Sequence, residues 1–240
     1  MLATAGLTKL AIFYSKKFGI IDTPSFRKIH KYLSLFISIQ LLLWTVSGIY
    51  FAFNKIELVR GEHLRNQKIE ELSFDLQDLP EIQAKSINIF MRMDQPIIKI
   101  NTINGISYLN QDGSSASKIS LDEAMIIVKN KTFLNPLSAL EIFDVPAGAE
   151  YRGRQLPLYQ VITDHQDNIK VYLDALSGEI VAIRSSSWRI WDFLWGLHIM
   201  DYVDRDNINN ILLKIFSILA LISSLSGVIL FFITQKKAIS

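Results

Sequence analysis

The chain has 240 residues, a formal net charge of +2 at pH 7 and no cysteine. The absence of cysteine excludes disulfides, thiolate zinc sites and cysteine-ligated iron–sulfur clusters. A charge this close to neutral creates no global basic field, so the composition does not indicate a nucleic-acid partner.

Residues 1–25 carry an amphipathic pattern. Leu7, Leu10, Tyr14 and Phe18 recur at the spacing of one helix face, and lysines interrupt the apolar residues. This pattern predicts a short helix on the cytoplasmic face of a membrane, with a disordered tail as the alternative.

Two charge-free apolar runs cover residues 32–53 and 215–234. Each has about 20 residues, which at about 1.5 Å per residue cross the ~30 Å hydrocarbon core of a bilayer. Buried core helices are the alternative, but no other segment of the chain is large enough to enclose two such helices. The runs therefore predict transmembrane helices over residues 26–54 and 208–235.

The charges that flank these runs predict their orientation. Basic residues precede the first run and follow the second, in the 236–240 tail, whereas acidic residues lie near the beginning of the second run. The positive-inside rule then places both termini in the cytoplasm and residues 55–186 outside it. We expect a multi-pass protein of the bacterial inner membrane with a periplasmic domain, for which the absence of cysteine is weak support.

The segment between the runs has the patterns of an α+β domain. Ser120 and Glu123 have the spacing of a capping box, and an apolar helical stripe follows them. Apolar and alternating segments at 158–163, 169–173 and 179–183 predict strands joined by polar turns.

A faint internal repeat lies within this domain. Residues 97–114 resemble residues 158–179, because both contain a strand, a turn and a second strand that ends in Tyr-Leu. Two such halves could form one longer sheet or two small packed units, and hairpins of this type also arise by coincidence. We expect an antiparallel sheet plus helix domain with two repeat-like halves.

Small and polar residues within the membrane runs indicate helix contacts. Each run holds a Ser-Gly pair, and a glutamine in mid-run is costly in lipid unless it is paired. Before the second run, residues 187–207 predict an aromatic helix at the membrane interface. The predicted interface residues are Gln40, Ser47, Gly48, Trp191, Trp195, Ser226 and Gly227.

Three of the four histidines are candidate ligands of haem iron or of a divalent metal. His63 and His198 are predicted near the outer membrane face, and His30 at the cytoplasmic end of the first helix. Neutral imidazoles could bind haem b, or a metal together with a carboxylate. The alternative is that His198 hydrogen-bonds within an aromatic belt and that His30 lies at the headgroup level. His165 is expected to be a solvated turn residue.

The membrane separates two of these candidates. About 22 helical residues, or about 33 Å, are expected between His30 and His198, so one chain does not bring both to one iron. A second ligand for each would come from another subunit or a second copy of the chain.

Catalytic motifs are absent from the sequence. It contains no nucleotide-binding glycine loop, no HExxH and no GxSxG. The segment Arg152-Gly-Arg154 is expected to be an ordinary solvated loop, with contact to a partner or a lipid headgroup as the alternative.

Four segments that together cover most of the chain carry further motifs. They are the helix and strands from Ser120 to Ile183 with their final Asp-x-x-x-Gly hairpin, the Arg-x-x-His start of residues 26–48, the Leu-His-x-x-Asp segment within residues 187–202, and VRGEHL at residues 59–64. The first resembles a PepSY domain, and the other three resemble the membrane segments of PepSY-associated transmembrane proteins.

This resemblance implies a function only loosely. Larger members resemble haem-containing inner-membrane reductases linked to iron–siderophore uptake, whereas isolated PepSY domains are linked with inhibition or chaperoning of peptidases. The present chain has two spans and no reductase domain. We expect an accessory subunit of an inner-membrane redox, electron-transfer or iron-uptake reductase system, without catalysis of its own. The alternative is a non-enzymatic extracytoplasmic binding module that regulates or assembles a partner.

The expected partners follow from this interpretation. They are membrane lipid together with a membrane protein, a periplasmic protein or a second copy of the chain. Haem b is the candidate cofactor, and the sequence does not identify a metal.

Overall fold

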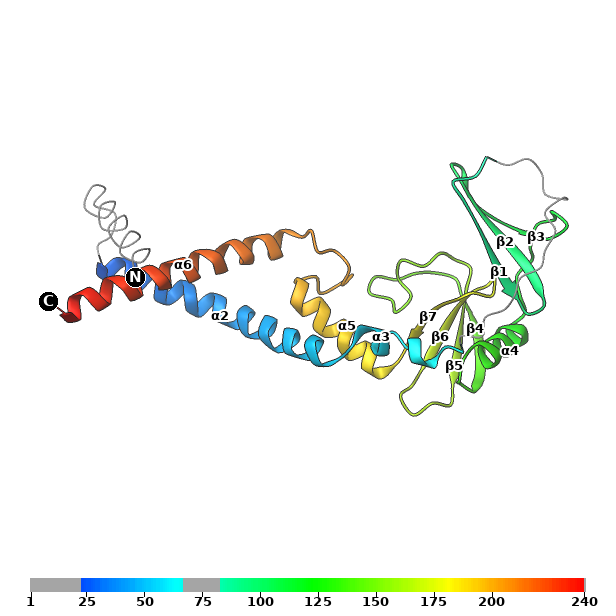
Figure 1. Cartoon of the computed structure of the whole chain (residues 1–240), viewed down its shortest axis with the longest axis horizontal. Coiled ribbons are helices and arrows are strands. Elements are labelled where there is room, and N and C mark those ends of the chain that lie inside the picture. Colours follow the sequence, from blue (N-terminus) through cyan, green and yellow to red (C-terminus); the bar gives the residue numbers. More distant parts are fainter. Residues whose placement is uncertain (1–22, 67–82, 240) are drawn as a thin grey trace. The chain divides into compact units, whose positions relative to one another are not determined.

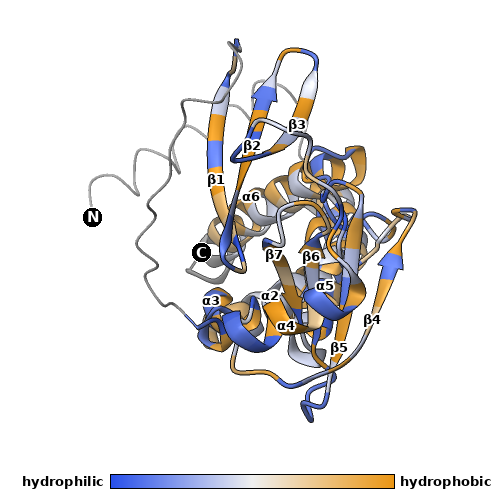
Figure 2. Ribbon diagram, turned by 90° about the vertical axis from the view of Figure 1, so that its right-hand side faces the viewer, coloured by the Kyte–Doolittle hydropathy of each residue, from blue (hydrophilic) through white to orange (hydrophobic). Residues whose placement is uncertain are grey.

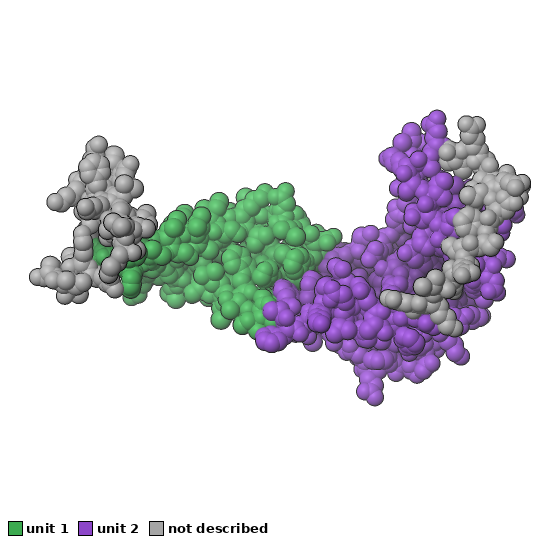
Figure 3. Space-filling view, in the orientation of Figure 1, with its two compact units in different colours: residues 1–49, 195–240 green, residues 50–194 purple. Residues whose placement is uncertain are grey.

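A computed structural model describes residues 23–66 and 83–239. The chain divides into two compact units, which are coloured separately in Figure 3. We call residues 1–49 and 195–240 the helix unit, and residues 50–194 the sheet unit.

Two long helices, α2 (Thr23–Phe53) and α6 (Ile211–Ile239), make up most of the helix unit (Figure 1). Each contains a candidate membrane span by length and composition, Pro24–Phe53 and Ile211–Thr234, and most residues of these spans are not buried. A core helix of a soluble protein would bury such residues, so their exposure favours lipid as their surroundings. The predicted amphipathic segment 1–25 lies almost entirely outside the described residues.

The sheet unit contains two antiparallel sheets (Figure 1). The first has three strands, β1 (Ser86–Arg92), β2 (Gln95–Thr102) and β3 (Gly105–Asn110). The second has four strands in chain order, β4 (Pro136–Ile142), β5 (Leu158–Thr163), β6 (Lys170–Asp174) and β7 (Ile180–Arg184). The remaining helices are α3 (Ile56–Val59), the 3₁₀ helix η1 (Glu62–Leu64), α4 (Leu121–Lys131) and α5 (Ser186–Ile199). The predicted α+β class is confirmed.

The two repeat-like halves lie in different sheets. Residues 97–114 contribute to β2 and β3, and residues 158–179 form β5 and β6. The structure therefore has two small sheets in place of one longer sheet. Figure 2 shows both hydrophobic and hydrophilic residues along β1, and none of the residues of this strand is buried.

Helix α4 begins at the predicted capping box. The backbone N–H of Glu123 donates to Ser120 Oγ at 3.1 Å, and the Glu123 carboxylate accepts from the Ser120 N–H at 2.6 Å. Both groups would otherwise be unsatisfied at a helix N-terminus. The helix then buries its apolar stripe against the four-stranded sheet, in a core that includes Ala124, Ile127, Val128, Val161, Val171 and Leu173.

Candidate functional site

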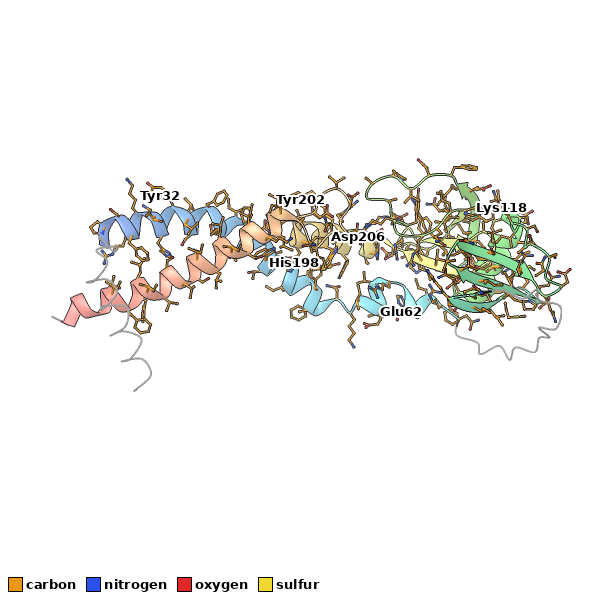
Figure 4. The ribbon with its side chains drawn as sticks, turned by 90° about the horizontal axis from the view of Figure 1, so that it is seen from above. Tyr32, Glu62, Lys118, His198, Tyr202 and Asp206 are labelled. Carbon is orange, nitrogen blue, oxygen red and sulfur yellow. The ribbon has the colours of Figure 1, made fainter. Side chains whose placement is uncertain are left out.

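His198 lies in the last turn of α5 and contacts α2 within the helix unit (Figure 4). Its Nδ1 is 2.7 Å from Ser47 Oγ, and Ser47 is completely buried. The same hydroxyl lies 2.7 Å from the Leu43 carbonyl oxygen, which can take its single proton. We therefore assign the proton of the imidazole to Nδ1, so that Nε2 carries the lone pair. Burial lowers the pKa of His198, which favours the neutral ring.

Side chains of α2 also satisfy the carbonyl groups at the end of α5. Gln40 Nε2 donates to the Leu197 carbonyl oxygen at 3.2 Å, and Trp44 Nε1 donates to that of His198 at 2.6 Å. Helix ends leave such carbonyls without an intrahelical partner, and leaving them unpaired is expensive where water is excluded. Gln40, which is only 5% exposed, is therefore paired with a helix end.

His30 forms a second cluster, between α2 and α6. Its Nδ1 is 2.7 Å from Ser226 Oγ, which in turn donates to the Ser223 carbonyl oxygen at 2.8 Å. Ser34 Oγ bridges the two helices, because it lies 2.9 Å from Ser223 Oγ and 3.3 Å from each ring nitrogen of His30. A Cβ at Gly227 would lie 3.2 Å from His30 Cε1, so this glycine leaves room for the ring.

The two imidazoles share one hydrogen-bonding arrangement. Each Nδ1 faces the serine of a Ser-Gly pair, and each serine hydroxyl also bonds a carbonyl of its own helix. A donor at Nδ1 that orients the ring and leaves the lone pair on Nε2 is the usual outer-shell arrangement of ligating histidines. His30 and the Ser47 partner of His198 are 17 residues apart on α2, or about 26 Å along the axis, so they define two separate sites.

Three other predicted interface residues, Trp195, Trp191 and Gly48, have surroundings that differ from one another. The Trp195 ring lies parallel to the His198 ring, with an interplanar angle of 8° and centroids 6.3 Å apart. Trp191 belongs to the sheet unit and packs on Phe51, with centroids 5.0 Å apart. A Cβ at Gly48 would meet no atom within 4 Å.

His63 lies in η1 and is exposed. It lines a cavity of about 370 Å³ together with His165 and Asp167, in the sheet unit. Asp167 N donates to His165 Nδ1 at 3.1 Å, and His165 is exposed in the turn. In the described parts of the chain, no three His, Asp or Glu side chains are grouped so that they could hold a metal ion. The shared role of His63 and His198 stays a prediction.

A charged network that the sequence did not indicate joins α5 to the four-stranded sheet. Arg189 donates to both carboxylate oxygens of Glu150, at 2.5 and 3.1 Å, and Tyr172 donates to Glu150 at 3.0 Å. Burial acts to raise the pKa of Glu150, but the hydrogen bonds and the charge of Arg189 outweigh it, so the pKa is lowered. Burial also lowers the pKa of Arg184 to about 10.

The surroundings of Arg152 differ from the solvated loop that the sequence predicted. In place of a solvated position, its guanidinium forms an ion pair with Asp192, which is 3% exposed. The guanidinium carbon also lies 5.8 Å from the centroid of the Trp188 ring, which Arg184 approaches to 4.2 Å. The partner on α5 is 40 residues away in sequence, so no local pattern could have indicated it. Arg154 remains exposed.

These features define a membrane protein in which an α+β domain is inserted between two apolar helices. The chain belongs to the family described as the PepSY-associated TM region, whose model matches residues 27–239. The predicted family is confirmed. Comparison with curated proteins and with solved structures gave no match.

Proposed function

We propose that this protein is an accessory subunit of an inner-membrane redox or iron-uptake system, without catalysis of its own. The observation that carries the proposal is the pair of imidazoles, His30 and His198, each of which has its Nδ1 2.7 Å from a serine hydroxyl. A neutral imidazole with an oriented outer shell is a good ligand for haem iron.

Each cluster would contribute one histidine, His30 or His198, to hold such a group, since its described residues include one histidine. A haem b held there would supply one-electron transfer, and its second ligand would come from a partner subunit or a second copy. The chain's own contribution is to orient each ring through a serine hydroxyl at Nδ1, and to place the two rings at different depths. The resemblance to haem-containing reductases supports the same interpretation.

The charges support an inner-membrane topology with cytoplasmic termini. Arg27, Lys28 and Lys31 are exposed near the start of α2, whereas Asp201, Asp204 and Asp206 lie in the loop before α6. Phe216 stacks on Phe36, so α6 begins level with about residue 41 of α2. Because acidic loops stay out of hydrocarbon, we place this loop and His198 on the outer side of the membrane.

Absorption spectroscopy tests the proposal. The full chain, purified in mild detergent from haem-replete cells, should show a Soret band that shifts on reduction with dithionite. His198→Ala and His30→Ala should each remove a distinct part of this band, because each would remove a histidine that holds the chromophore. His63→Ala tests the third candidate, and His165→Ala is the matched control with an exposed imidazole. A folded wild-type chain without a chromophore would contradict the proposal.

The second candidate, an extracytoplasmic binding module, is favoured by the outer edge of β4. Among the described residues this strand pairs with β5 alone, and large apolar side chains are exposed on it and beside it. Phe133 is 71% exposed, Leu137 63% and Phe143 78%. An exposed apolar edge strand is a template for pairing with an extended segment of another protein.

Site-specific cross-linking distinguishes this function. A photoreactive amino acid in place of Leu137 should give one adduct of defined mass in native membranes, and the same group in place of the exposed Asp122 should give none. Loss of the adduct when Phe143→Lys is introduced would confirm that the apolar edge is the contact. Equal labelling from both positions would contradict a specific interface.

A further inference from the structure

A cavity of about 560 Å³ lies in the sheet unit, where the first sheet approaches the edge of the second. It is lined by β2 and β3, by β7 and by the loop around Arg154. Its volume is that of a typical small-molecule site. The charged residues that line it are Arg65, Lys99, Arg154, Asp174 and Glu179.

Glu179 is a half-buried carboxylate at this cavity. Its backbone N–H donates to Ser177 Oγ at 3.2 Å and its carbonyl accepts from Asp174 N at 2.9 Å. Its carboxylate makes no hydrogen bond or ion pair with any side chain in the described parts of the chain. Burial raises the pKa of Glu179, which is the expected response of a carboxylate that lacks a direct partner.

In the second carboxylate of the cavity, Asp174, both oxygens accept hydrogen bonds. Its Oδ1 accepts from the backbone N–H groups of Leu176 and Ser177 at 2.8 and 3.0 Å. Its Oδ2 accepts from the Tyr108 hydroxyl at 2.5 Å. Asp174 therefore holds the β6–β7 turn and the first sheet together, and Glu179 is the acid available to a ligand.

The three cations of the cavity differ in their contacts. Arg65 is committed to the structure, because its Nη2 donates to the Ile180 carbonyl oxygen at 2.9 Å. Lys99 forms an ion pair with Asp174 at 4.0 Å, and its Nζ also lies 5.3 Å from the centroid of the Tyr108 ring. Arg154 is exposed, and its side chain makes no ion pair or hydrogen bond within residues 23–66 and 83–239.

The charges of the cavity select its ligand. A simple cation would meet Arg65, Lys99 and Arg154, and a simple anion would meet Glu179 and Asp174. Glu179 and Arg154 influence each other electrostatically but form no ion pair within 4.0 Å. A ligand that carries both charges would satisfy both groups at once.

We propose that this cavity binds a zwitterionic ligand of the amino-acid type, with its ammonium group at Glu179 and its carboxylate at Arg154 and Lys99. A free amino acid and a short peptide share this chemistry, and the volume accommodates either. This site is independent of the histidine clusters and of the exposed edge of β4.

Isothermal titration calorimetry on the full chain in detergent tests this site. The probes are alanine, dialanine, N-acetylalanine and alanine amide. We expect alanine or dialanine to bind, and the ratio of their affinities tells a free amino acid from a short peptide. Removing either charge, by acetylation or amidation, should weaken binding at least about tenfold, as expected for a lost charge-assisted bond.

Two variants and their controls complete the experiment. Glu179→Gln and Arg154→Gln should each weaken binding of the uncapped probe about tenfold or more, whereas Glu57→Gln and Arg60→Gln, at exposed positions, should leave it unchanged. N-acetylalanine should not distinguish Glu179→Gln from the wild-type chain, because it has no ammonium group. The proposal is overturned if capped and uncapped probes bind the wild-type chain equally, or if no uncapped probe binds at about 10 mM.

Discussion

Replacing Asp192 by alanine is expected to lower the free energy of unfolding of the sheet unit by about 3–5 kcal/mol. Asp192 is 3% exposed and forms an ion pair with Arg152, whose side chain is 16% exposed. The substitution leaves the guanidinium buried without this carboxylate, and an uncompensated buried charge is costlier than the net value of the pair. Urea unfolding followed by tryptophan fluorescence measures the effect, since Trp188 lies beside Arg152.

Two further variants separate charge burial from general destabilisation. Asp144→Ala removes an exposed carboxylate and should change the free energy of unfolding by less than about 0.5 kcal/mol. The double variant Arg152→Met with Asp192→Leu should recover most of the loss, because an apolar pair replaces a buried ion pair at little cost. Equal stability of Asp192→Ala and Asp144→Ala would show that the ion pair does not stabilise the sheet unit.

Substituting Gly61 by alanine is the second change with a large expected effect. Gly61 has φ +74°, and a Cβ there would lie 2.8 Å from Ile183 Cγ2, in the hydrophobic core. Positive φ costs an alanine about 1–3 kcal/mol, and overpacking a core costs typically about 1–3 kcal/mol more. We expect a loss of about 2–6 kcal/mol in the free energy of unfolding, measured in the same way.

Gly153 provides a matched control for this substitution. Its φ is +73°, but a Cβ there would meet no atom within 4 Å. Gly153→Ala should therefore show the cost of backbone strain alone, and the difference between the two variants isolates the contact with Ile183. If the two variants lose the same stability, the close approach of Gly61 to the core is unimportant.

Features that depend on local sequence could be predicted. The apolar runs predicted α2 and α6 because about 20 residues without charge are rare outside membranes. The capping box at Ser120 predicted the start of α4, since both of its hydrogen bonds span three residues. The cost of a polar side chain in lipid predicted Gln40, Ser47 and Ser226 as contact residues, and in the structure these side chains are buried and hydrogen-bonded to other helices.

Features that depend on tertiary structure could not be predicted. The Ser-Gly pairs indicated close contacts, but nothing local indicated that their serines would face His30 and His198, across 196 and 151 residues of sequence. The Glu150 network and the isolated Glu179 carboxylate arise from the packing of strands onto α5 and onto the first sheet. A local sequence pattern does not indicate which distant side chain pairs with a buried charge.

The polar contacts of α2 have a mechanical consequence for the helix unit. Gln40, Ser47 and Ser34 each meet a specific partner on α5 or α6, and a slide of one helix turn, about 5.4 Å, would break all of these bonds in a medium without water. The helices therefore cannot adapt to a thinner or thicker bilayer by sliding past one another. The helices of this unit must therefore tilt together as one rigid body, and the His30 and His198 sites change their depth in the bilayer together.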